Sequence, residues 1–328
     1  MFERVFKLSE HKTTVKTEVM AGITTFMTMA YILAVNPSVL GSTGMDTTAV
    51  LLATALASCL GTLCMAFMAN LPFALSAGMG LNAFMAYTVV AGYGYSWQVA
   101  LLAVFIEGLL FIVLSLTNVR EAIFNAIPLT LKKGVSVGIG LFIAFIGLQN
   151  SGLCVDSATL VGIISFPENF HTAGICALLT LIGLFFTAVF YTRKMKGAIL
   201  YGILLTWILG MLCQVTGLYV PTPDAGFYSL FPSWGMTDFS KLGLTFGQCF
   251  NVDFSAVGIV NFIVVIFSFL FVDIFDTLGT LIGVATKAKM LDKDGKLPGI
   301  KPALLADSIA TSAGAILGTS TCLLSTFR

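Results

Sequence analysis

Two aspartates, Asp273 and Asp276, lie within residues 269–280, one of the most apolar stretches of this sequence. If the stretch is a helix, its rotation of about 100° per residue places both aspartates, Thr277 and Thr280 on one stripe. A charged group at the centre of a bilayer costs about 2.5 kcal/mol or more, so such groups usually face a cavity and mark substrate or proton pathways. We predict that Asp276 contacts a substrate and that Asp273 supports a proton path or ties two helices together. A purely structural polar stripe is the alternative.

A second polar interruption, residues 76–84, contains Gly78, Gly80, Asn82 and Phe84. Two glycines this close together make a poor helix, so we expect a broken helix or a short extended segment here. Irregular backbone at membrane depth survives only where it lines a cavity enclosed by protein. Asn82 offers an amide and Phe84 an aromatic face, which suits a planar heterocycle that hydrogen-bonds and stacks. Close packing of small residues is the alternative.

The elements that position these side chains follow from composition. Of the 328 residues, 57% are hydrophobic and only 10% are charged, and the mean hydropathy is +0.97. Soluble domains carry about 25% charged residues, so the chain is predicted to be a membrane protein. A net charge of +1 gives no sign of a nucleic-acid partner. The seven cysteines include no CxxC and are interpreted as apolar filler, so we expect no metal site.

Nine apolar runs are predicted to cross the membrane as helices, because most are long enough to span a hydrocarbon core of about 30 Å. These runs are residues 18–36, 49–68, 73–91, 98–117, 135–150, 174–192, 198–216, 256–285 and 303–318. The broken or extended segment falls in the third run. The predicted fold class is therefore an all-α polytopic membrane protein.

The basic residues predict the orientation. Fifteen of the 17 Lys and Arg fall in four segments that share one side of the membrane if the N-terminus is cytoplasmic. This is the distribution that the positive-inside rule describes. The opposite side holds six aspartates and glutamates with Lys241. We therefore expect a multi-pass protein of the cell membrane with a cytoplasmic N-terminus.

An internal repeat relates residues 51–61 to residues 304–314 at an offset of 253, with five identical positions. The second span then corresponds to the ninth, and an odd number of spans per unit inverts the second unit. Secondary transporters are commonly built this way and hold substrate where the units meet. We predict a first seven-span unit over residues 1–254. An incomplete inverted unit, with the start of a tenth span, is predicted over residues 255–328.

Two further acids lie within the predicted spans. Glu107, in the fourth span, could join a proton path or form a polar tie to another helix. Asp307 is expected near the cytoplasmic start of the ninth span, where a negative charge favours a helix N-terminus.

Six segments resemble the AzgA-type nucleobase permeases, purine transporters of the nucleobase–cation symporter group. They are residues 11–18, 22–37, 78–84, 271–280, 292–298 and 303–308, among them Gly78-Met-Gly-Leu-Asn-Ala-Phe84. The resemblance implies fourteen spans in two inverted units and proton-coupled uptake of guanine, hypoxanthine or adenine. It also implies a site formed by Asp276 and Thr280 of the eighth span, Asn82 of the third, and the tenth span.

In the expected transport cycle, an acid near Asp276 is protonated from outside. The purine then binds Asp276, Asn82 and the backbone near Gly78 and Gly80, and one module rocks against the other. A proton is the expected coupling ion, with no other cofactor. The expected partners are the purine and the lipid bilayer, and a homodimer is left open.

Members of the family continue beyond Thr321 with the rest of a tenth span, which contributes a glutamate, whereas residues 322–328 differ from that pattern. We therefore expect this chain by itself not to form the complete site, and an inert fragment is an alternative to a transporter. An intramembrane aspartyl protease would place its aspartates on separate helices, unlike Asp273 and Asp276. A transporter of inorganic anions would expose its substrate to repulsion from both carboxylates.

Overall fold

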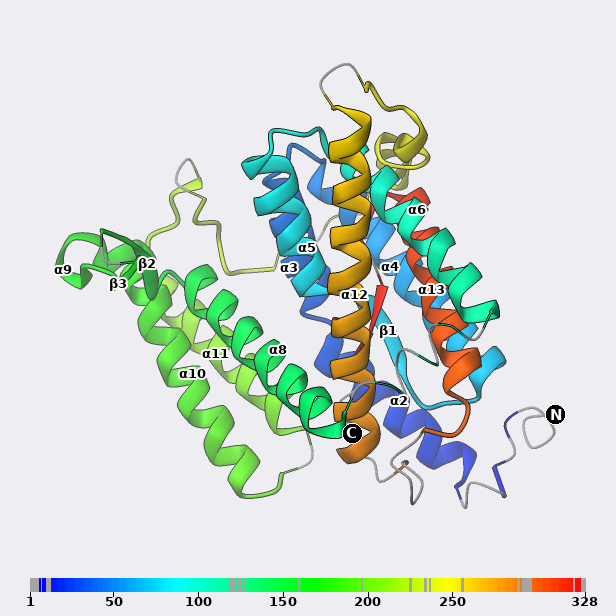
Figure 1. The fold of residues 1–328 in the computed structure, drawn as a ribbon. Coiled ribbons are helices and arrows are strands. Elements are labelled where there is room, and N and C mark those ends of the chain that lie inside the picture. Colours follow the sequence, from blue (N-terminus) through cyan, green and yellow to red (C-terminus); the bar gives the residue numbers. More distant parts are fainter. Residues whose placement is uncertain are drawn as a thin grey trace. The chain divides into compact units, whose positions relative to one another are not determined.

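A computed structural model gives the fold of the chain. It describes residues 6, 8–9, 13–117, 119, 122, 126, 128–158, 160–195, 197–223, 226–232, 235, 237–254, 257–287, 290, 297–320 and 322–325. The described chain is mostly helical (Figure 1). It forms two compact units, one from residues 1–140 and 237–328 and the other from residues 141–236.

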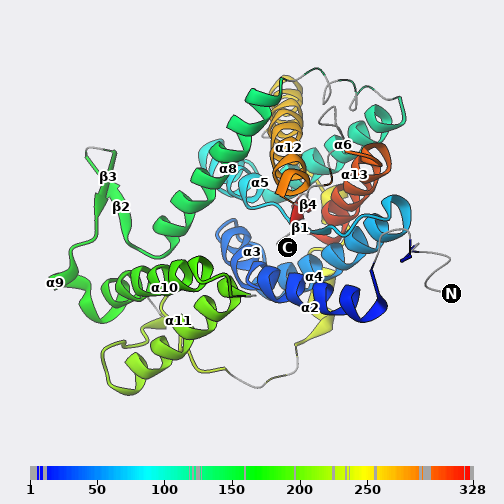
Figure 2. The same cartoon turned by 90° about the horizontal axis from the view of Figure 1, so that it is seen from below.

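The first unit contains most of the helices and one pair of strands. Its helices are α2 (Val15–Met29), α3 (Ile32–Gly41), α4 (Thr47–Cys64), α5 (Met79–Ala83), α6 (Trp97–Leu116), α12 (Ile259–Lys287) and α13 (Ile300–Leu317), and π-helical turns extend α4 as η1 (Met65–Ala69) and α5 as η2 (Phe84–Gly92). Strands β1 (Ala74–Ala77) and β4 (Cys322–Ser325) pair antiparallel. Figure 2 shows this pair among α3, α4, α12 and α13, which contact it.

Helices α4 and α13 match the sequence repeat. Both are 18 residues long, and their first and last residues are each separated by the offset of 253 that the sequence shows. Each is followed by a short strand, and the two strands run antiparallel, which is the geometry that an inverted repeat produces. The predicted division into two repeats at residues 254 and 255 stays a prediction. The first compact unit contains helices from both predicted repeats, so the compact units do not test this boundary.

Small residues of the repeat allow the helices of this unit to approach closely. A Cβ placed on Gly61 of α4 would lie 2.9 Å from the Cβ of Ala310 of α13. Helix α13 also packs against α6, where Gly108 faces Ser312. Lipid tails are as apolar as Leu side chains, so close packing of small residues is a main source of helix association in a membrane.

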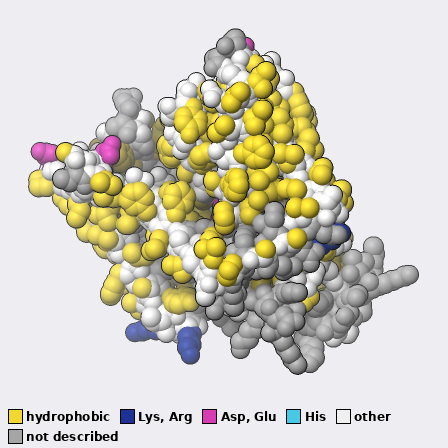
Figure 3. Space-filling view, viewed as in Figure 1, with side chains coloured by type: hydrophobic (Ala, Val, Ile, Leu, Met, Phe, Trp, Pro, Cys, Tyr) yellow, Lys and Arg dark blue, Asp and Glu magenta, His cyan; other side chains and the backbone are white. Residues whose placement is uncertain are grey.

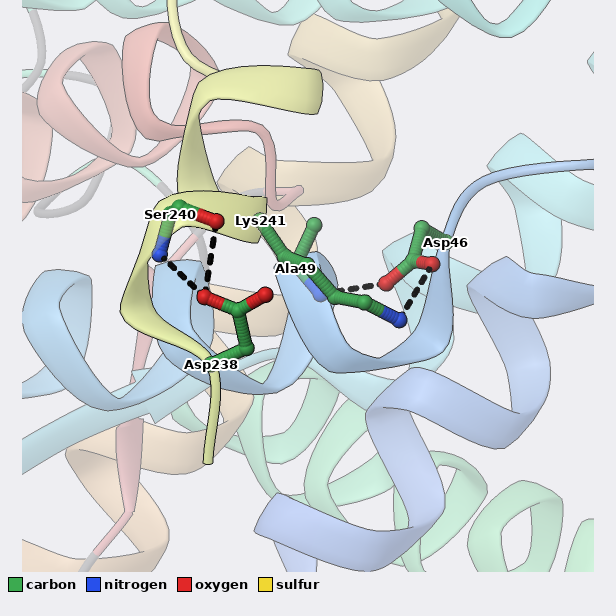
Figure 4. A network of polar contacts seen from close by, with 5 residues as sticks. All are labelled: Asp46, Ala49, Asp238, Ser240 and Lys241. Carbon is green, nitrogen blue, oxygen red and sulfur yellow. Dashed lines mark hydrogen bonds and ion pairs between the residues drawn. The ribbon is translucent and has the colours of Figure 1, made fainter. Parts of the chain in front are cut away.

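A polar network joins the segment before α12 to the start of α4 (Figure 4). Asp46 caps α4 by accepting from the backbone N–H of Ala49 at 2.9 Å, and its second oxygen lies 3.3 Å from Nζ of Lys241. Asp238 caps the 3-10 helix η5 (Phe239–Leu244) by accepting from the N–H and the hydroxyl of Ser240, at 3.0 and 2.7 Å. The Ala49 N–H holds the pKa of Asp46 below its ordinary value, and the Ser240 hydroxyl does the same for the pKa of Asp238.

The second unit is a helical layer with a short hairpin. Helix α8 (Leu129–Asn150) leads into it, followed by β2 (Cys154–Ser157), β3 (Leu160–Ile163), α9 (Phe166–Asn169), the π-helical turn η3 (Phe170–Gly174), α10 (Ile175–Thr192) and α11 (Ala198–Val215). Helices α10 and α11 pack through two reciprocal contacts, Gly183 against Thr206 and Gly202 against Thr187. Acidic side chains lie at one end of this unit and basic side chains at the other (Figure 3).

Seven helical segments among the described residues are long and apolar enough to cross a membrane. They are Val15–Gly41, Thr47–Ala69, Trp97–Leu116, Phe166–Thr192, Ala198–Val215, Ile259–Thr286 and Ile300–Leu317. The chain is therefore a multi-pass membrane protein. The structure does not confirm the predicted count of nine spans, because only seven described segments are long enough to cross a membrane as helices.

The two remaining predicted spans correspond to shorter apolar helices, Met79–Gly92 and Gly140–Asn150. In the first of these, strand β1 precedes the helix, so the expected extended segment is present just before Gly78. Several basic residues behind the orientation prediction, including Arg4, Lys7 and Lys12, lie outside the described residues.

Candidate functional site

The two aspartates lie on a buried stripe of α12. Asp273 is fully buried, and Asp276 is 7% exposed. On other faces of the same helix, Phe271 and Phe275 are 58% and 39% exposed. The stripe predicted from helical spacing is therefore present, with carboxylates turned toward protein and phenylalanines turned outward.

A hydroxyl links this stripe to a second helix. Oγ1 of Thr277, which is itself buried, lies 3.0 Å from Oδ1 of Asp273 and 3.4 Å from Oδ2 of Asp307 on α13. A threonine hydroxyl carries one hydrogen, so it can donate fully to one of these two carboxylates at a time. The three side chains form one buried polar cluster across α12 and α13.

The position of Asp307 corrects its sequence interpretation. We expected a charge at the start of a helix, but α13 begins at Ile300, and Asp307 is its eighth residue and fully buried. It is therefore beyond the first turn, where the helix dipole acts, and it belongs with the carboxylates of α12. Asp276 lies within electrostatic range of both Asp273 and Asp307.

Thr280, which the resemblance placed in the substrate site, uses its hydroxyl on its own helix. Its Oγ1 donates to the backbone carbonyl of Asp276 at 2.8 Å and lies 3.3 Å from that of Thr277. The side chain is half-buried. Thr280 thus lies one helical turn after Asp276, and its hydroxyl hydrogen is used in this intrahelical bond. The hydroxyl can therefore only accept a hydrogen bond from a ligand.

Asn82 of α5 is fully buried and is held by a residue that sequence reasoning missed. Its Nδ2 donates to Oδ1 of Asn36, a fully buried residue of α3. Asn36 in turn donates to Oγ1 of Thr54 at 2.7 Å and to Oγ1 of Thr319 at 2.9 Å. The network therefore joins α3, α4, α5 and the residues that follow α13.

The amide oxygen of Asn82 can accept a hydrogen bond from a ligand. Its Oδ1 is buried and has no hydrogen-bond partner among the described residues. The described contacts of Asn82 include no bond to Asp276, so the structure does not join these two predicted site residues directly. The helices that carry them do pack together.

Phe84 marks the contact between these helices. Its ring meets that of Phe269 of α12 edge to face, with centroids 5.0 Å apart. Gly78 precedes α5 with φ of −81° and ψ of 112°, an extended conformation that continues strand β1. Gly80 lies within α5 and is half-buried. The predicted glycine segment thus provides the turn from strand to helix beside Asn82.

Glu107 is fully buried on α6, where the next residue, Gly108, faces Ser312 of α13. No group of three or more His, Cys, Asp or Glu with metal-binding geometry occurs among the described residues. Carboxylates, amides and hydroxyls in this arrangement can accept and donate hydrogen bonds and can hold a proton.

Comparison with known proteins identifies the family. A model described as the permease family matches residues 16–326. A putative permease of Methanocaldococcus jannaschii is 47% identical over 320 residues, covering 97% of this chain and 68% of the relative. The adenine permease AdeP of Escherichia coli is 41% identical over 98% of this chain and 67% of its own length. The guanine/hypoxanthine permease PbuO of Bacillus subtilis is 43% identical over 96% of this chain and 69% of its own length.

The match extends over nearly the whole chain, and it includes α3, α5, α12 and α13, the elements that carry the buried polar groups. Several such relatives each span the same elements at more than 40% identity. The chain therefore belongs to the permease family, whose members are membrane transporters and not enzymes.

Proposed function

We propose that this chain carries purine nucleobases across the cell membrane, with protons as the coupling ion. The observation that carries the proposal is that one compact unit combines a buried carboxylate stripe on α12 with a buried amide oxygen on α5. Among the described residues this oxygen has no hydrogen-bond partner. The relatives supply the substrate class, because proteins 41% and 43% identical to this chain are named as adenine and guanine/hypoxanthine permeases.

The chemistry of a purine fits these groups. Ring N–H groups would donate to the carboxylate of Asp276 and to Oδ1 of Asn82, and the flat ring would stack on Phe84. Backbone groups near Gly78 and Gly80 supply further hydrogen bonds where no Cβ intervenes. Two or more carboxylates in the same site would repel an inorganic anion, which disfavours that alternative.

Proton coupling is assigned to Asp273, Thr277 and Asp307. The Thr277 hydroxyl offers one hydrogen to two carboxylates. An added proton on either aspartate would provide a second donor and remove a negative charge from an apolar site, where a charge is costly. Protonation from outside would therefore prepare the site for purine, and rocking of one module would open it to the cytoplasm.

A cytoplasmic N-terminus is part of this proposal. In the second unit, Asp156 and Glu168 are exposed on β2 and α9, before α10, and Arg193 and Lys194 are exposed directly after α10. The positive-inside rule places the basic end of such a helix in the cytoplasm. Because α10 corresponds to the sixth predicted span, its C-terminal end lies on the same side of the membrane as the N-terminus of the chain.

The test is uptake of radiolabelled hypoxanthine, guanine and adenine in cells that lack their own purine transporters. Because the chain spans about two thirds of its relatives, it is expressed alone and also continued by the C-terminal third of PbuO. We expect uptake that unlabelled purine competes and sulfate does not, and that a proton uncoupler abolishes. Competition by sulfate, or absence of uptake from both forms, would contradict the proposal.

A further inference from the structure

The directions of the hydrogen bonds that Asn36 makes can be deduced. The hydroxyl of Thr54 donates to the backbone carbonyl of Val50 at 2.6 Å, so its single hydrogen is committed. Thr54 can therefore only accept from Asn36, and the atom of Asn36 that faces it at 2.7 Å must be the amide nitrogen. The oxygen of Asn36 then faces Asn82.

The same reasoning orients Asn82. The oxygen of Asn36 cannot donate, so the atom of Asn82 that meets it must be Nδ2. A backbone carbonyl on α4 thus determines, through two side chains, which way the amide on α5 points. Thr319, which accepts the second N–H of Asn36 at 2.9 Å, holds this orientation from the segment after α13.

The outcome is an acceptor of fixed position. Oδ1 of Asn82 is buried and has no hydrogen-bond partner among the described residues, and leaving a buried acceptor unsatisfied is costly. A ligand that places an N–H group against this oxygen removes the cost. A ligand that places a lone pair there does not.

We propose that Asn36 is a specificity-determining positioning residue, which acts by holding the Asn82 amide with its oxygen toward the substrate. This inference rests on the proposed purine transport. Hypoxanthine and adenine exchange donor and acceptor at ring position 1 and at the group on position 6. A fixed acceptor therefore distinguishes the two bases, whereas an amide that is free to turn over can satisfy either.

The experiment measures the ratio of the inhibition constants of hypoxanthine and adenine, in whichever expressed form transports. Asn36→Leu removes the acceptor for Asn82 Nδ2 and should bring the ratio toward one by at least about fivefold, the equivalent of one hydrogen bond. A merely structural role would lower uptake of both bases equally and leave the ratio unchanged.

Two variants on α4 keep the test decisive if Asn36→Leu does not fold. Thr54→Val removes the acceptor that orients Asn36 and should also bring the ratio toward one. Ser58→Ala, one turn further along α4, removes a bond of 2.9 Å to Ser76 outside this network and should leave the ratio unchanged. A wild-type ratio near one, or an unchanged ratio in both Asn36→Leu and Thr54→Val, would overturn the inference. Absence of purine uptake by the wild type would instead refute the proposed function.

Discussion

Thr277 on α12 reaches Asp307 on α13, with 3.4 Å between its Oγ1 and the Oδ2 of the aspartate. The same hydroxyl is 3.0 Å from Oδ1 of Asp273 on its own helix. A single hydroxyl hydrogen thus serves two buried carboxylates that the sequence separates by 34 positions. Under the proposed function, we therefore expect Thr277 to couple the protonation of Asp273 to that of Asp307.

Replacing Thr277 tests that coupling. Thr277→Val removes the shared hydrogen and should reduce uncoupler-sensitive accumulation of purine by about tenfold or more, since a hydrogen bond to a charged group contributes about 1.5–3 kcal/mol. Thr277→Ser retains the hydroxyl and should accumulate purine nearly as the wild type does. The measurement is accumulation in transport-deficient cells with and without uncoupler. Equal accumulation by the valine and serine variants would refute the role.

The contact between α10 and α11 should not tolerate a larger residue at Gly202. A Cβ there would collide with Oγ1 of Thr187, which is held by a 2.8 Å hydrogen bond to the carbonyl of Gly183. Gly202→Ala should therefore destabilise the protein by about 1–3 kcal/mol. Thermal unfolding in detergent measures this effect. Gly147→Ala on α8, where nothing lies within 4 Å, is the matched control, and similar melting temperatures for the two variants would contradict the packing argument.

The Asp46 cap predicts how stability depends on pH. Hydrogen bonding to Ala49 lowers the pKa of Asp46 in the folded protein below its value in the unfolded chain. The stabilisation is therefore complete above the unfolded pKa and is lost as the pH falls through the lowered folded pKa. Asp46→Asn keeps a capping side chain but cannot titrate.

We expect the melting temperature of the wild type to fall more steeply than that of Asp46→Asn between about pH 5 and pH 3. The measurement is thermal unfolding across that range. Parallel curves for the two proteins would show that the Asp46 carboxylate contributes nothing to this dependence.

Much of α12 could be predicted from sequence alone. Its apolar length indicates a membrane helix, and helical spacing alone places Asp273 and Asp276 on one face, because both properties are local. The glycines at 78 and 80 likewise predicted an extended segment, which the structure places just before them as β1. The offset of the sequence repeat also predicted that α4 and α13 have matching bounds, because the length of each helix depends mainly on its own local sequence.

The partners of these residues could not be predicted. Asn36 lies 46 positions from Asn82 and 283 from Thr319, and nothing in the apolar segment around it indicates those contacts. The signal available was a polar amide within an otherwise apolar span, directly before Pro37. Asp307 was assigned to a helix end because the start of α13 was placed too late, at 303, whereas the helix begins at Ile300.

The central claim is that the buried carboxylate of Asp276 holds the purine, and hypoxanthine uptake by two aspartate variants tests it most directly. Asp276→Asn alters the buried group, and Asp156→Asn makes the same chemical change at an exposed position on β2. At equal abundance in the membrane, Asp276→Asn should lose at least about tenfold in uptake, as expected for one charge-assisted hydrogen bond, while Asp156→Asn should match the wild type. Uptake by Asp276→Asn at the wild-type rate would contradict the account.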